Sequence, residues 1–534
     1  MKRALLVLLA MVGILAAPFL LRPTEEVVSK AGTQRLVIIS PHNETIRSEF
    51  EKAFTRHMRE TTGREVLIDW RQPGGTAEIA LFLKSEYERV FREHWIKQTN
   101  RPFSPEARSG FAASRPGDGE AKEARRLFLD SSVGVGVDLF FGGGAFDFQR
   151  QADAGALVST DASGRFGPGA YAKEHPEVFT DAVFPQMVGG EPYRDPEFRW
   201  LGCCLSSFGI CYNTDVLERL QAKPPTQWSD LADPVYLGQI ALADPAKSGS
   251  ATKAFEMILQ QQMQLALNEG MKEPEAVAEG WMRGWRLIQR ISGNGRYFTD
   301  SATKIPHDVA AGDSAAGMCI DFYGRTYNEL HRQPDGSSRI QFVTPIGGTS
   351  TGVDPIGLLR GAPSPELAHQ FLAFVLSPAG QRLWNYRPGT PGGPDRVALR
   401  RLPVRRDSYA AADLAHFTDP EVLPYDHADA FTYHESWTGP VFGALRFIMR
   451  CGCVESHIEQ RSAWRALIAA GFPAEAKEAF DDLSFIDLAH ATDEIGAALK
   501  AKNKVKEVEL ARELSAKFRA HYARVLALTE TKSP

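Results

Sequence analysis

Short apolar strands alternate with amphipathic helices from about residue 35 to residue 375, and this alternation limits the possible folds more than any other feature. Residues 35–40 (RLVIIS) are apolar and β-branched, and within residues 46–61 the apolar side chains recur every four positions. Residues 65–70 (EVLIDW) predict a second strand, and the turn at residues 74–76 opens a second helix. Alternation of buried strands with helices is typical of α/β domains with mainly parallel sheets. We therefore predict an α/β architecture.

The same pattern predicts further elements along the chain. Buried strands are expected at residues 133–141, 209–213, 238–243, 314–323, 341–344 and 355–359. Helices are expected at residues 251–267 and 280–291, and another after Pro365. Trp281 and Trp285 share one face of their helix, so we expect both in the core.

These elements divide into two lobes and an extension. Lobe one is expected to comprise residues 35–200 and 341–404, with a solvated insertion at about residues 98–130 that is rich in Pro, Gly, Ser and charge. Lobe two is expected to comprise residues 201–340. Residues 405–534 change to longer, polar-rich helices and predict a helical extension, either a lid over lobe two or a docking surface.

The first 30 residues predict export from the cytoplasm. An uncharged apolar run of 18 residues, 4–21, follows Lys2 and Arg3. This is the pattern of a signal peptide or a membrane anchor, and the length of the run favours the anchor. The basic residues stay inside, so the chain from about Arg22 onward is expected in the periplasm, tethered to the inner membrane.

Composition and motifs exclude several other classes of function. Lys and Arg total 61 against 66 Asp and Glu, a net charge of −5, so no basic surface is available for nucleic acid. The sequence 348–352 (GTSTG) fits the G-x-S-x-G expression, but a strand-like segment follows it instead of the helix that a nucleophilic Ser350 requires. Residues 142–144 lack the third glycine of a dinucleotide loop. We expect no enzymatic activity and no cofactor.

Six cysteines leave more than one interpretation open. In an exported protein they can pair, in connectivities that sequence does not choose between. Cys451, Cys453 and His457 could form part of a metal site that lacks a fourth ligand. Structural thiols or a disulfide are the preferred interpretation.

Small and polar residues follow the ends of the predicted strands. In open α/β sheets, ligands bind beyond the carboxyl ends of the strands, where small residues let main-chain amides approach them. We therefore predict a small-molecule cleft lined by His42, Asn43, Gly75, Thr76, Gly143, Gly144, Ser248, Gly249, Ser250, Asp321, Tyr323 and Asp354.

From about residue 35 to residue 405 the chain resembles the type 2 periplasmic solute-binding proteins of ABC importers, in the branch that includes ferric-ion-binding proteins. The resemblance is carried by five blocks in order: LVIISPHNE, VDLFFGGGAFDFQRQADAGALV, FGICYNTDVL, AAGMCIDFY and GVDPIGLLRGAPSPELAHQFLAFVLSPAGQRLWN. It implies two α/β lobes joined by crossing hinge strands. It also implies a monomer that closes on a solute and delivers it to an ABC permease in the inner membrane.

The resemblance also bears on the solute. Ferric-binding members use a His, a Glu and two adjacent Tyr; His42 and Tyr323 match, but Gly143 and Phe322 stand at the other two positions. We therefore predict a small polar solute that contains an anionic group or is zwitterionic. Main-chain amides at 142–144 and 248–250 would bind the anion, and Asp321 and Asp354 would bind an amine or hydroxyls.

Three alternatives stay open at this stage. The glycines can form a tight turn without ligand, and Ser250 can be a helix N-cap. The chain can be a ferric-ion-binding protein that uses His42 and Tyr323. It can also be a membrane-anchored sensor or scaffold that keeps the binding fold.

Overall fold

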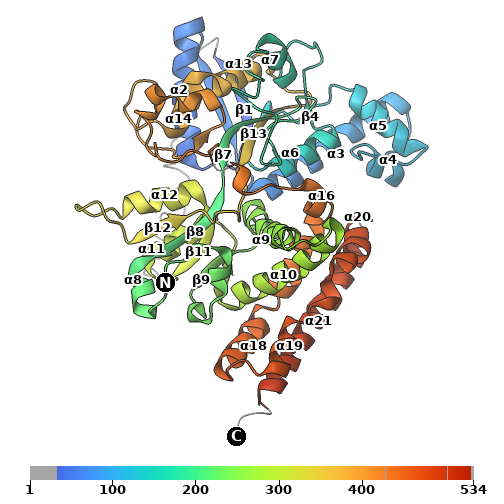
Figure 1. Cartoon of the computed structure of the whole chain (residues 1–534). Coiled ribbons are helices and arrows are strands. Elements are labelled where there is room, and N and C mark those ends of the chain that lie inside the picture. Colours follow the sequence, from blue (N-terminus) through green and yellow to red (C-terminus); the bar gives the residue numbers. More distant parts are fainter. Residues whose placement is uncertain (1–32, 427, 502, 531–534) are drawn as a thin grey trace, which may run out of the picture.

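Two separate β-sheets organise the chain into an upper and a lower lobe (Figure 1). The computed structural model describes residues 33–426, 428–501 and 503–530. The expected signal peptide or anchor at residues 1–30 lies outside the described residues. Within them, no helix combines the length and the apolar character that a membrane span requires.

The sheet of lobe one has the strand order β14-β7-β13-β3-β1-β2, and β4 also pairs with β13. β1 runs parallel to β2 and β3, whereas β13 runs antiparallel to β3, β4 and β7. The strands are β1 (Gln34–Ile39), β2 (Val66–Arg71), β3 (Leu139–Phe141), β4 (Leu157–Val158), β7 (Leu201–Ser206), β13 (Gly352–Leu359) and β14 (Leu402–Pro403), with a separate hairpin of β5 (Met187–Val188) and β6 (Glu191–Pro192).

Helices cover this sheet and its edges. They are α2 (Glu44–Thr62), α3 (Thr76–Thr99), α4 (Pro105–Gly110), α5 (Glu120–Asp130), α6 (Ala145–Ala154), α7 (Pro168–Glu174), α13 (Pro365–Leu376) and α14 (Pro378–Asn385). The apolar side chains of α2 that recur every four residues, Ile46, Phe50, Phe54 and Met58, are all buried, which is why this segment is a helix with one face on the sheet.

The sheet of lobe two has the order β10-β9-β11-β8-β12. β9 runs parallel to β10 and β11, and β8 runs antiparallel to β11 and β12. Its strands are β8 (Phe208–Asn213), β9 (Ile240–Ala243), β10 (Gly295–Thr299), β11 (Ala316–Ile320) and β12 (Ile340–Val343), and its helices are α8 (Thr214–Leu220), α9 (Gly249–Asn268), α10 (Glu273–Gly293), α11 (Lys304–Ala311) and α12 (Asp321–Leu330).

The chain crosses between the lobes where β7 meets β8 at Ser207, and again between β12 and β13. This confirms the two-lobed fold with crossing strands. The crossings lie several residues beyond the expected boundaries, because β7 and β8 are equally apolar and the sequence does not mark the change of sheet. Both sheets are mixed, so the expectation of mainly parallel sheets is wrong: each strand that enters from the other lobe runs antiparallel to its neighbours.

Three elements differ from the sequence-based expectation. Only Leu139–Phe141 of the strand expected at 133–141 pairs, since the backbone at Gly134 packs directly against Gly361. The strand expected at 314–323 ends at Ile320, and Asp321 opens α12. The insertion is not a solvated loop: it forms α4 and α5, whose neighbouring rings Phe103, Phe111 and Phe128 pack on Phe91 of α3.

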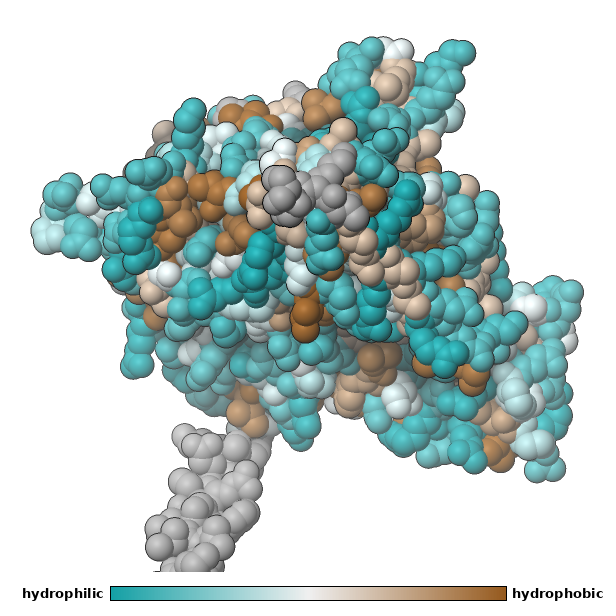
Figure 2. Space-filling model, turned by 90° about the horizontal axis from the view of Figure 1, so that it is seen from below, coloured by the Kyte–Doolittle hydropathy of each residue, from teal (hydrophilic) through white to brown (hydrophobic). Residues whose placement is uncertain are grey.

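The extension is not an independent unit. Val422 and Tyr425 pack on the core of lobe one, whereas Trp437 and the helices after it share one core with Trp281 and Trp285 of lobe two. The helices after Pro403 are α15 (Ala411–Leu414), α16 (Glu435–Thr438), α17 (Phe442–Met449), α18 (His457–Ala469), α19 (Ala474–Asp481), α20 (Ala497–Lys500) and α21 (Lys504–Glu530). Seen from below, the surface is mostly hydrophilic, with apolar residues in small separate areas (Figure 2).

Helices α9 and α10 pack closely against each other, and this contact allows a test of the core of lobe two. A Cβ at Gly280 of α10 would lie 2.3 Å from Cα of Met263 on α9, so no larger residue fits without separating the helices. We expect Gly280→Ala to lower the free energy of unfolding by about 1–3 kcal/mol in urea titrations. The control is Gly443→Ala on α17, where the nearest atom is 3.9 Å away. It should be neutral or stabilising by up to about 1 kcal/mol, and equal effects at both sites would contradict the close packing.

Candidate functional site

A cleft of about 1240 Å³ lies between the two lobes. Lobe one supplies the loops after β1, β2 and β3, and lobe two supplies the loops after β9 and β11. The extension supplies Tyr433, Glu435 and Phe442 to the same lining. The cleft therefore has three walls, one more than the two that were expected from the sequence.

At least five helices begin at this cleft, among them α2, α3, α6, α9 and α12. Their N-cap residues Asn43, Gly75, Gly144, Ser248 and Ile320, which precede α2, α3, α6, α9 and α12, all line it. The side chains of Asn43 and Ser248 accept hydrogen bonds from first-turn amides, but Gly75, Gly144 and Ile320 give no side-chain cap. Free first-turn amides and the positive ends of the helix dipoles favour an anionic group.

His42 and Asp354 form the base of the cleft. His42 Nε2 lies 3.3 Å from Asp354 Oδ2, and its imidazole packs against Gly142, where a Cβ would come within 2.5 Å of the ring. Burial lowers the pKa of His42, although Asp354 opposes this shift. The neutral imidazole is therefore favoured at neutral pH. No hydrogen-bond partner is found for Nδ1 among the described residues.

Arg401 completes this group and was not predicted. Its Nη2 donates to Asp354 Oδ2 at 2.7 Å, and its guanidinium lies 4.1 Å from the ring centroid of Phe322. The side chain is only 5% exposed, and its Nε and Nη1 have no hydrogen-bond partner among the described residues. Burial alone would raise the pKa of Asp354, but Arg401 and His42 lower it below its ordinary value. Both members of the pair are therefore charged.

Eleven of the twelve predicted site residues line the cleft; Asp321 does not. Asp321 is buried and accepts a hydrogen bond from Arg325 Nη2 at 2.9 Å. Asp354 lines the cleft, but Arg401, His42 and Ser206 contact its oxygens. The prediction that Asp321 lines the cleft is therefore wrong, because it pairs with Arg325 away from the lining. The prediction that Asp354 contacts an amine or hydroxyls of the solute stays a prediction.

The glycine and serine loops lie where the sequence placed them. Gly143 has a φ of +123°, and a Cβ there would lie 2.9 Å from Thr76 Cγ2, so the loop after β3 contacts the start of α3. Ser248, rather than Ser250, is the N-cap of α9. Burial raises the pKa of Tyr323, whose hydroxyl interacts with the Asn43 side chain.

The other sequence motifs take structural positions. Ser350 Oγ donates to Glu191 Oε1 at 2.5 Å, instead of pairing with a histidine base. The six cysteines are buried free thiols, so the disulfide interpretation is wrong. His457 Nε2 lies 3.2 Å from the carbonyl oxygen of Ser292. Among the described residues, no group of three or more His, Cys, Asp or Glu could hold a metal ion, and this includes the surroundings of His42.

Comparison with known proteins supports the sequence-based resemblance. A family model for bacterial extracellular solute-binding proteins matches residues 132–401, about half of the chain. The phosphoglycerate transport regulatory protein PgtC of Salmonella typhimurium is 26% identical over 179 residues, which cover 34% of this chain and 39% of PgtC. An uncharacterised protein of Haemophilus influenzae is 25% identical over 248 residues, 46% of this chain and 60% of that protein. The matches thus span between two fifths and three fifths of these relatives.

Solved structures with a similar fold include a periplasmic binding protein and an iron-bound protein. The periplasmic binding protein AfuA from Actinobacillus pleuropneumoniae, bound to fructose-6-phosphate, has a TM-score of 0.43 and 18% identity, covering 65% of this chain and 81% of AfuA. Iron-bound HitA from Pseudomonas aeruginosa has a TM-score of 0.46 and 16% identity, covering 77% of this chain and 98% of HitA.

The Arg401–Asp354 pair gives a test of the base of the cleft. We expect Arg401→Met to destabilise the protein by about 3–5 kcal/mol in urea titrations, because Asp354 is left buried without its partner. Adding Asp354→Asn to Arg401→Met should recover part of the lost stability, because the double variant has no unpaired buried carboxylate. The control is Arg382→Met, which removes the surface pair with Asp413 and should cost less than about 1 kcal/mol. A loss at Arg401 no larger than at Arg382 would contradict the assignment.

Proposed function

The chain belongs to the bacterial extracellular solute-binding proteins, and from this premise we propose that it is a periplasmic receptor for a small organic anion. It binds the solute in the cleft between its lobes and delivers it to an ABC permease in the inner membrane. The receptor acts as a monomer, without enzymatic activity and without nucleic acid as a partner.

The observation that carries this proposal is the convergence of five helix N-termini on one cleft. Each terminus presents amides and the positive end of a helix dipole. Arg401 adds a permanent positive charge with two nitrogens that have no partner among the described residues. A carboxylate or phosphate group is the chemistry that these donors recognise best.

The size of the cleft supports an organic solute over a bare ion. Pockets for drug-sized ligands measure roughly 300–1,000 Å³, and this cleft, at about 1240 Å³, is larger. The position where the resemblance implies an iron-binding tyrosine is Phe322, whose ring contacts the guanidinium of Arg401. A cation next to this ring favours an anion in the cleft and opposes Fe³⁺.

The remaining lining supports a second polar part on the solute. The carboxylates of Glu78, Asp147 and Glu435 also line the cleft, and burial raises the pKa of Asp147. Carboxyl groups in the same lining suit hydroxyls or an ammonium group on the solute. The solute is therefore proposed to be a hydroxylated or zwitterionic organic anion. The name of the relative PgtC supports this class, since phosphoglycerate carries a phosphate, a carboxylate and a hydroxyl.

A regulatory receptor is the second candidate. It is favoured by the word "regulatory" in the name of PgtC and by the extension, which packs on lobe two and lines the cleft. Both candidates bind the same class of solute. They differ in a strain that lacks the protein: a transport receptor predicts lost solute uptake, and a regulator predicts lost expression of a transporter.

A thermal-shift screen of residues 33–534 tests the solute class. We expect phosphorylated hydroxy acids or phosphorylated sugars to raise the melting temperature, because a ligand at a hundredfold excess over its Kd adds about 2.7 kcal/mol of stability. Amino acids, polyamines, phosphonates and ferric citrate complete the panel. Stabilisation by polyamines alone or by ferric salts alone would refute an organic anion as the solute.

Substitution of Gly143 tests whether the loop after β3 borders the solute. We expect Gly143→Val to weaken solute binding by at least about tenfold, equivalent to 1.4 kcal/mol, because the side chain would enter the anion site beside Thr76. The control is Gly136→Val: Gly136 also has a positive φ, but no atom lies within 4 Å of its Cβ position. Gly143→Val should lose more stability in urea than Gly136→Val because of the contact with Thr76, so the Kd values are measured under conditions in which both variants are folded. Equal calorimetric Kd values would show that Gly143 lies outside the site.

A further inference from the structure

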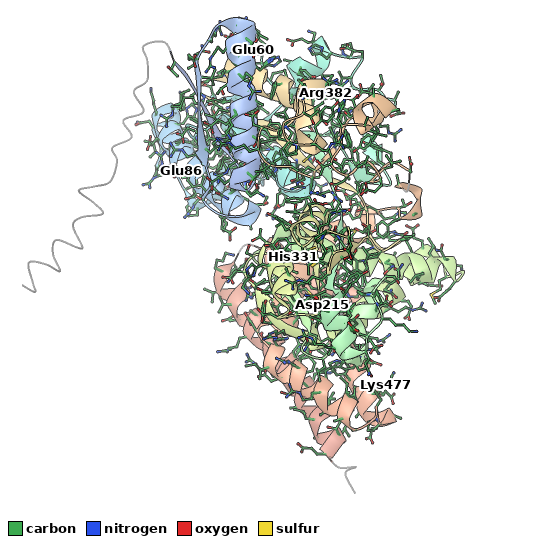
Figure 3. The ribbon with its side chains drawn as sticks, turned by 90° about the vertical axis from the view of Figure 1, so that its left-hand side faces the viewer. Glu60, Glu86, Asp215, His331, Arg382 and Lys477 are labelled. Carbon is green, nitrogen blue, oxygen red and sulfur yellow. The ribbon has the colours of Figure 1, made fainter. Side chains whose placement is uncertain are left out.

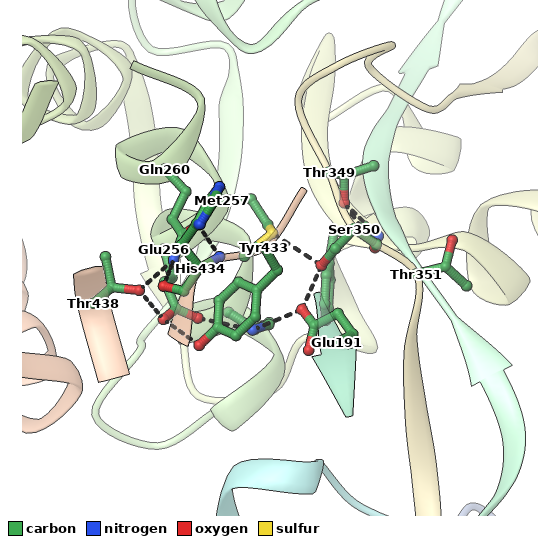
Figure 4. Close-up of polar contacts among 12 residues, drawn as sticks. Glu191, Glu256, Met257, Gln260, Thr349, Ser350, Thr351, Tyr433, His434 and Thr438 are labelled. Atoms are coloured by element: carbon green, nitrogen blue, oxygen red, sulfur yellow. Dashed lines mark hydrogen bonds and ion pairs between the residues drawn. The ribbon is translucent and has the colours of Figure 1, made fainter. Parts of the chain in front are cut away.

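A buried cluster of charged and aromatic side chains joins the two lobes to the extension (Figure 4). We call it the lysine cluster and define it as Lys253, Glu191, Glu256 and Tyr433. Lys253 on α9 of lobe two lies 2.9 Å from Glu191 Oε1, which belongs to β6 of lobe one. It also lies 3.0 Å from Glu256 Oε2 on its own helix. One ammonium thus pairs with carboxylates from both lobes.

The lysine cluster is shielded from water. The side chain of Glu191 is 4% exposed and that of Glu256 is fully buried, whereas Lys253 is 22% exposed. Burial alone would lower the pKa of Lys253, but Glu191 and Glu256 raise it above its ordinary value, so the ammonium stays charged. Opening of the lobes would separate Glu191 from Lys253. The ion pair therefore stabilises the lobe arrangement of this structure over one in which the lobes are further apart.

Tyr433 of the extension holds Lys253 in this position. The ammonium lies 3.4 Å from the centroid of the Tyr433 ring, a close cation–π contact. The Tyr433 hydroxyl donates to Glu256 Oε1 at 3.0 Å. Its backbone N–H donates to the carbonyl of Gly189 at 2.8 Å, in the turn that leads into β6. Tyr433 thus contacts both lobes at once.

The segment around Tyr433 is fixed on α9. Gln260 Nε2 donates to Thr438 Oγ1 and to the carbonyl oxygen of His434, both at 2.7 Å. The N–H of His434 donates to Gln260 Oε1 at 2.8 Å. Figure 4 shows these contacts on the lobe-two side of the cluster, opposite Glu191 and Ser350. Residues 433–438 therefore act as a third connection between the lobes, after the two crossings of the chain.

Two further contacts made by residues after position 400 join the lobes. Phe146 of α6 packs on Phe442 of the extension, with ring centroids 4.3 Å apart. Arg325 of α12 contacts Asp419, which follows β14. The backbone N–H of Asp419 donates a hydrogen bond to Asn385 Oδ1 of lobe one. In each case the chain after residue 400 supplies one partner. Closure is thus supported by residues outside the two crossing segments.

We propose that Tyr433 is a positioning residue of the solute site, which holds Lys253 in the ion pair with Glu191 and so keeps the lobes closed. This inference rests on the proposed receptor function, since closure matters for a protein that encloses a solute. Pre-closure raises solute affinity because the solute spends less of its binding energy on moving the lobes. The extension is then part of the closing mechanism and not only a docking surface.

Distance measurements between the lobes test this proposal without any solute. Glu60 on α2 and Asp215 on α8 are exposed and lie in different lobes (Figure 3). Spin labels would be attached there through non-natural amino acids, because the chain has six cysteines of its own. The test variant is Glu191→Gln. It removes the pair between the lobes and leaves Lys253 neutralised by Glu256, so the fold is retained.

We expect Glu191→Gln to lengthen the distance between the labels in buffer alone and to weaken solute binding by about tenfold. Tyr433→Phe keeps the ring and loses the hydrogen bond to Glu256, so it should lengthen the distance less. The control is Asp308→Asn, which breaks a matched pair within lobe two: Lys304 pairs with Asp308 and lies over the ring of Tyr297. This control should leave the distance unchanged.

The outcomes separate this inference from the proposed function. Equal distances in Glu191→Gln and in the unmodified protein would overturn the positioning role of Tyr433 even if the solute screen succeeds. A lengthened distance together with a screen in which no anion binds would support the closing contact and overturn the proposed solute class. If Asp308→Asn also lengthens the distance between the labels, the effect of Glu191→Gln reflects a general loss of stability, and the inference is overturned.

Discussion

The paired burial of Asp354 and Arg401 is the interaction on which the cleft depends. β13 brings Asp354 back from the second crossing, and Arg401 arrives directly before β14, on the far side of β7 in the same sheet. Neither charge could be buried alone without a cost of several kcal/mol. Together they fix His42 from lobe one and the Phe322 ring from lobe two. The base of the cleft is therefore also a contact between the lobes.

The lysine cluster is a second set of paired charges that joins the two lobes, and here the extension takes part. Lys253 lies between carboxylates of both lobes, and Tyr433 contacts it from the extension. Residues after Pro403 first pack on lobe one and then on lobe two, so this part of the chain is bound to both lobes. Separation of the lobes would break contacts of this segment with one of them, so its contacts favour the lobe arrangement of this structure.

Local patterns predicted most strands, helices and loops, and long-range pairings explain what they missed. The loops with His42, Gly143 and Ser248 follow strand ends in the sequence, so their place at the cleft could be predicted. Arg401 could not, because its partner Asp354 lies 47 residues away and no motif surrounds either residue. Asp321 was misassigned for a local reason: the strand was expected to continue to Tyr323, whereas Asp321 opens α12 and pairs with Arg325 one helical turn later. The lysine cluster joins residues from three regions that only the fold brings together.

Coupling between the extension and the cleft is necessarily reciprocal. If contacts of Tyr433 favour closure, and closure favours the solute, then a bound solute strengthens the attachment of the extension to α9 by the same free energy. A membrane partner that draws the extension away from α9 would weaken solute binding by an equal factor, without touching the cleft. The same coupling between the extension and the cleft could serve either proposed function: release of the solute to a permease, or transmission of solute binding to a regulatory partner. Tyr433 can carry this coupling because it contacts Lys253 of lobe two and Gly189 of lobe one directly.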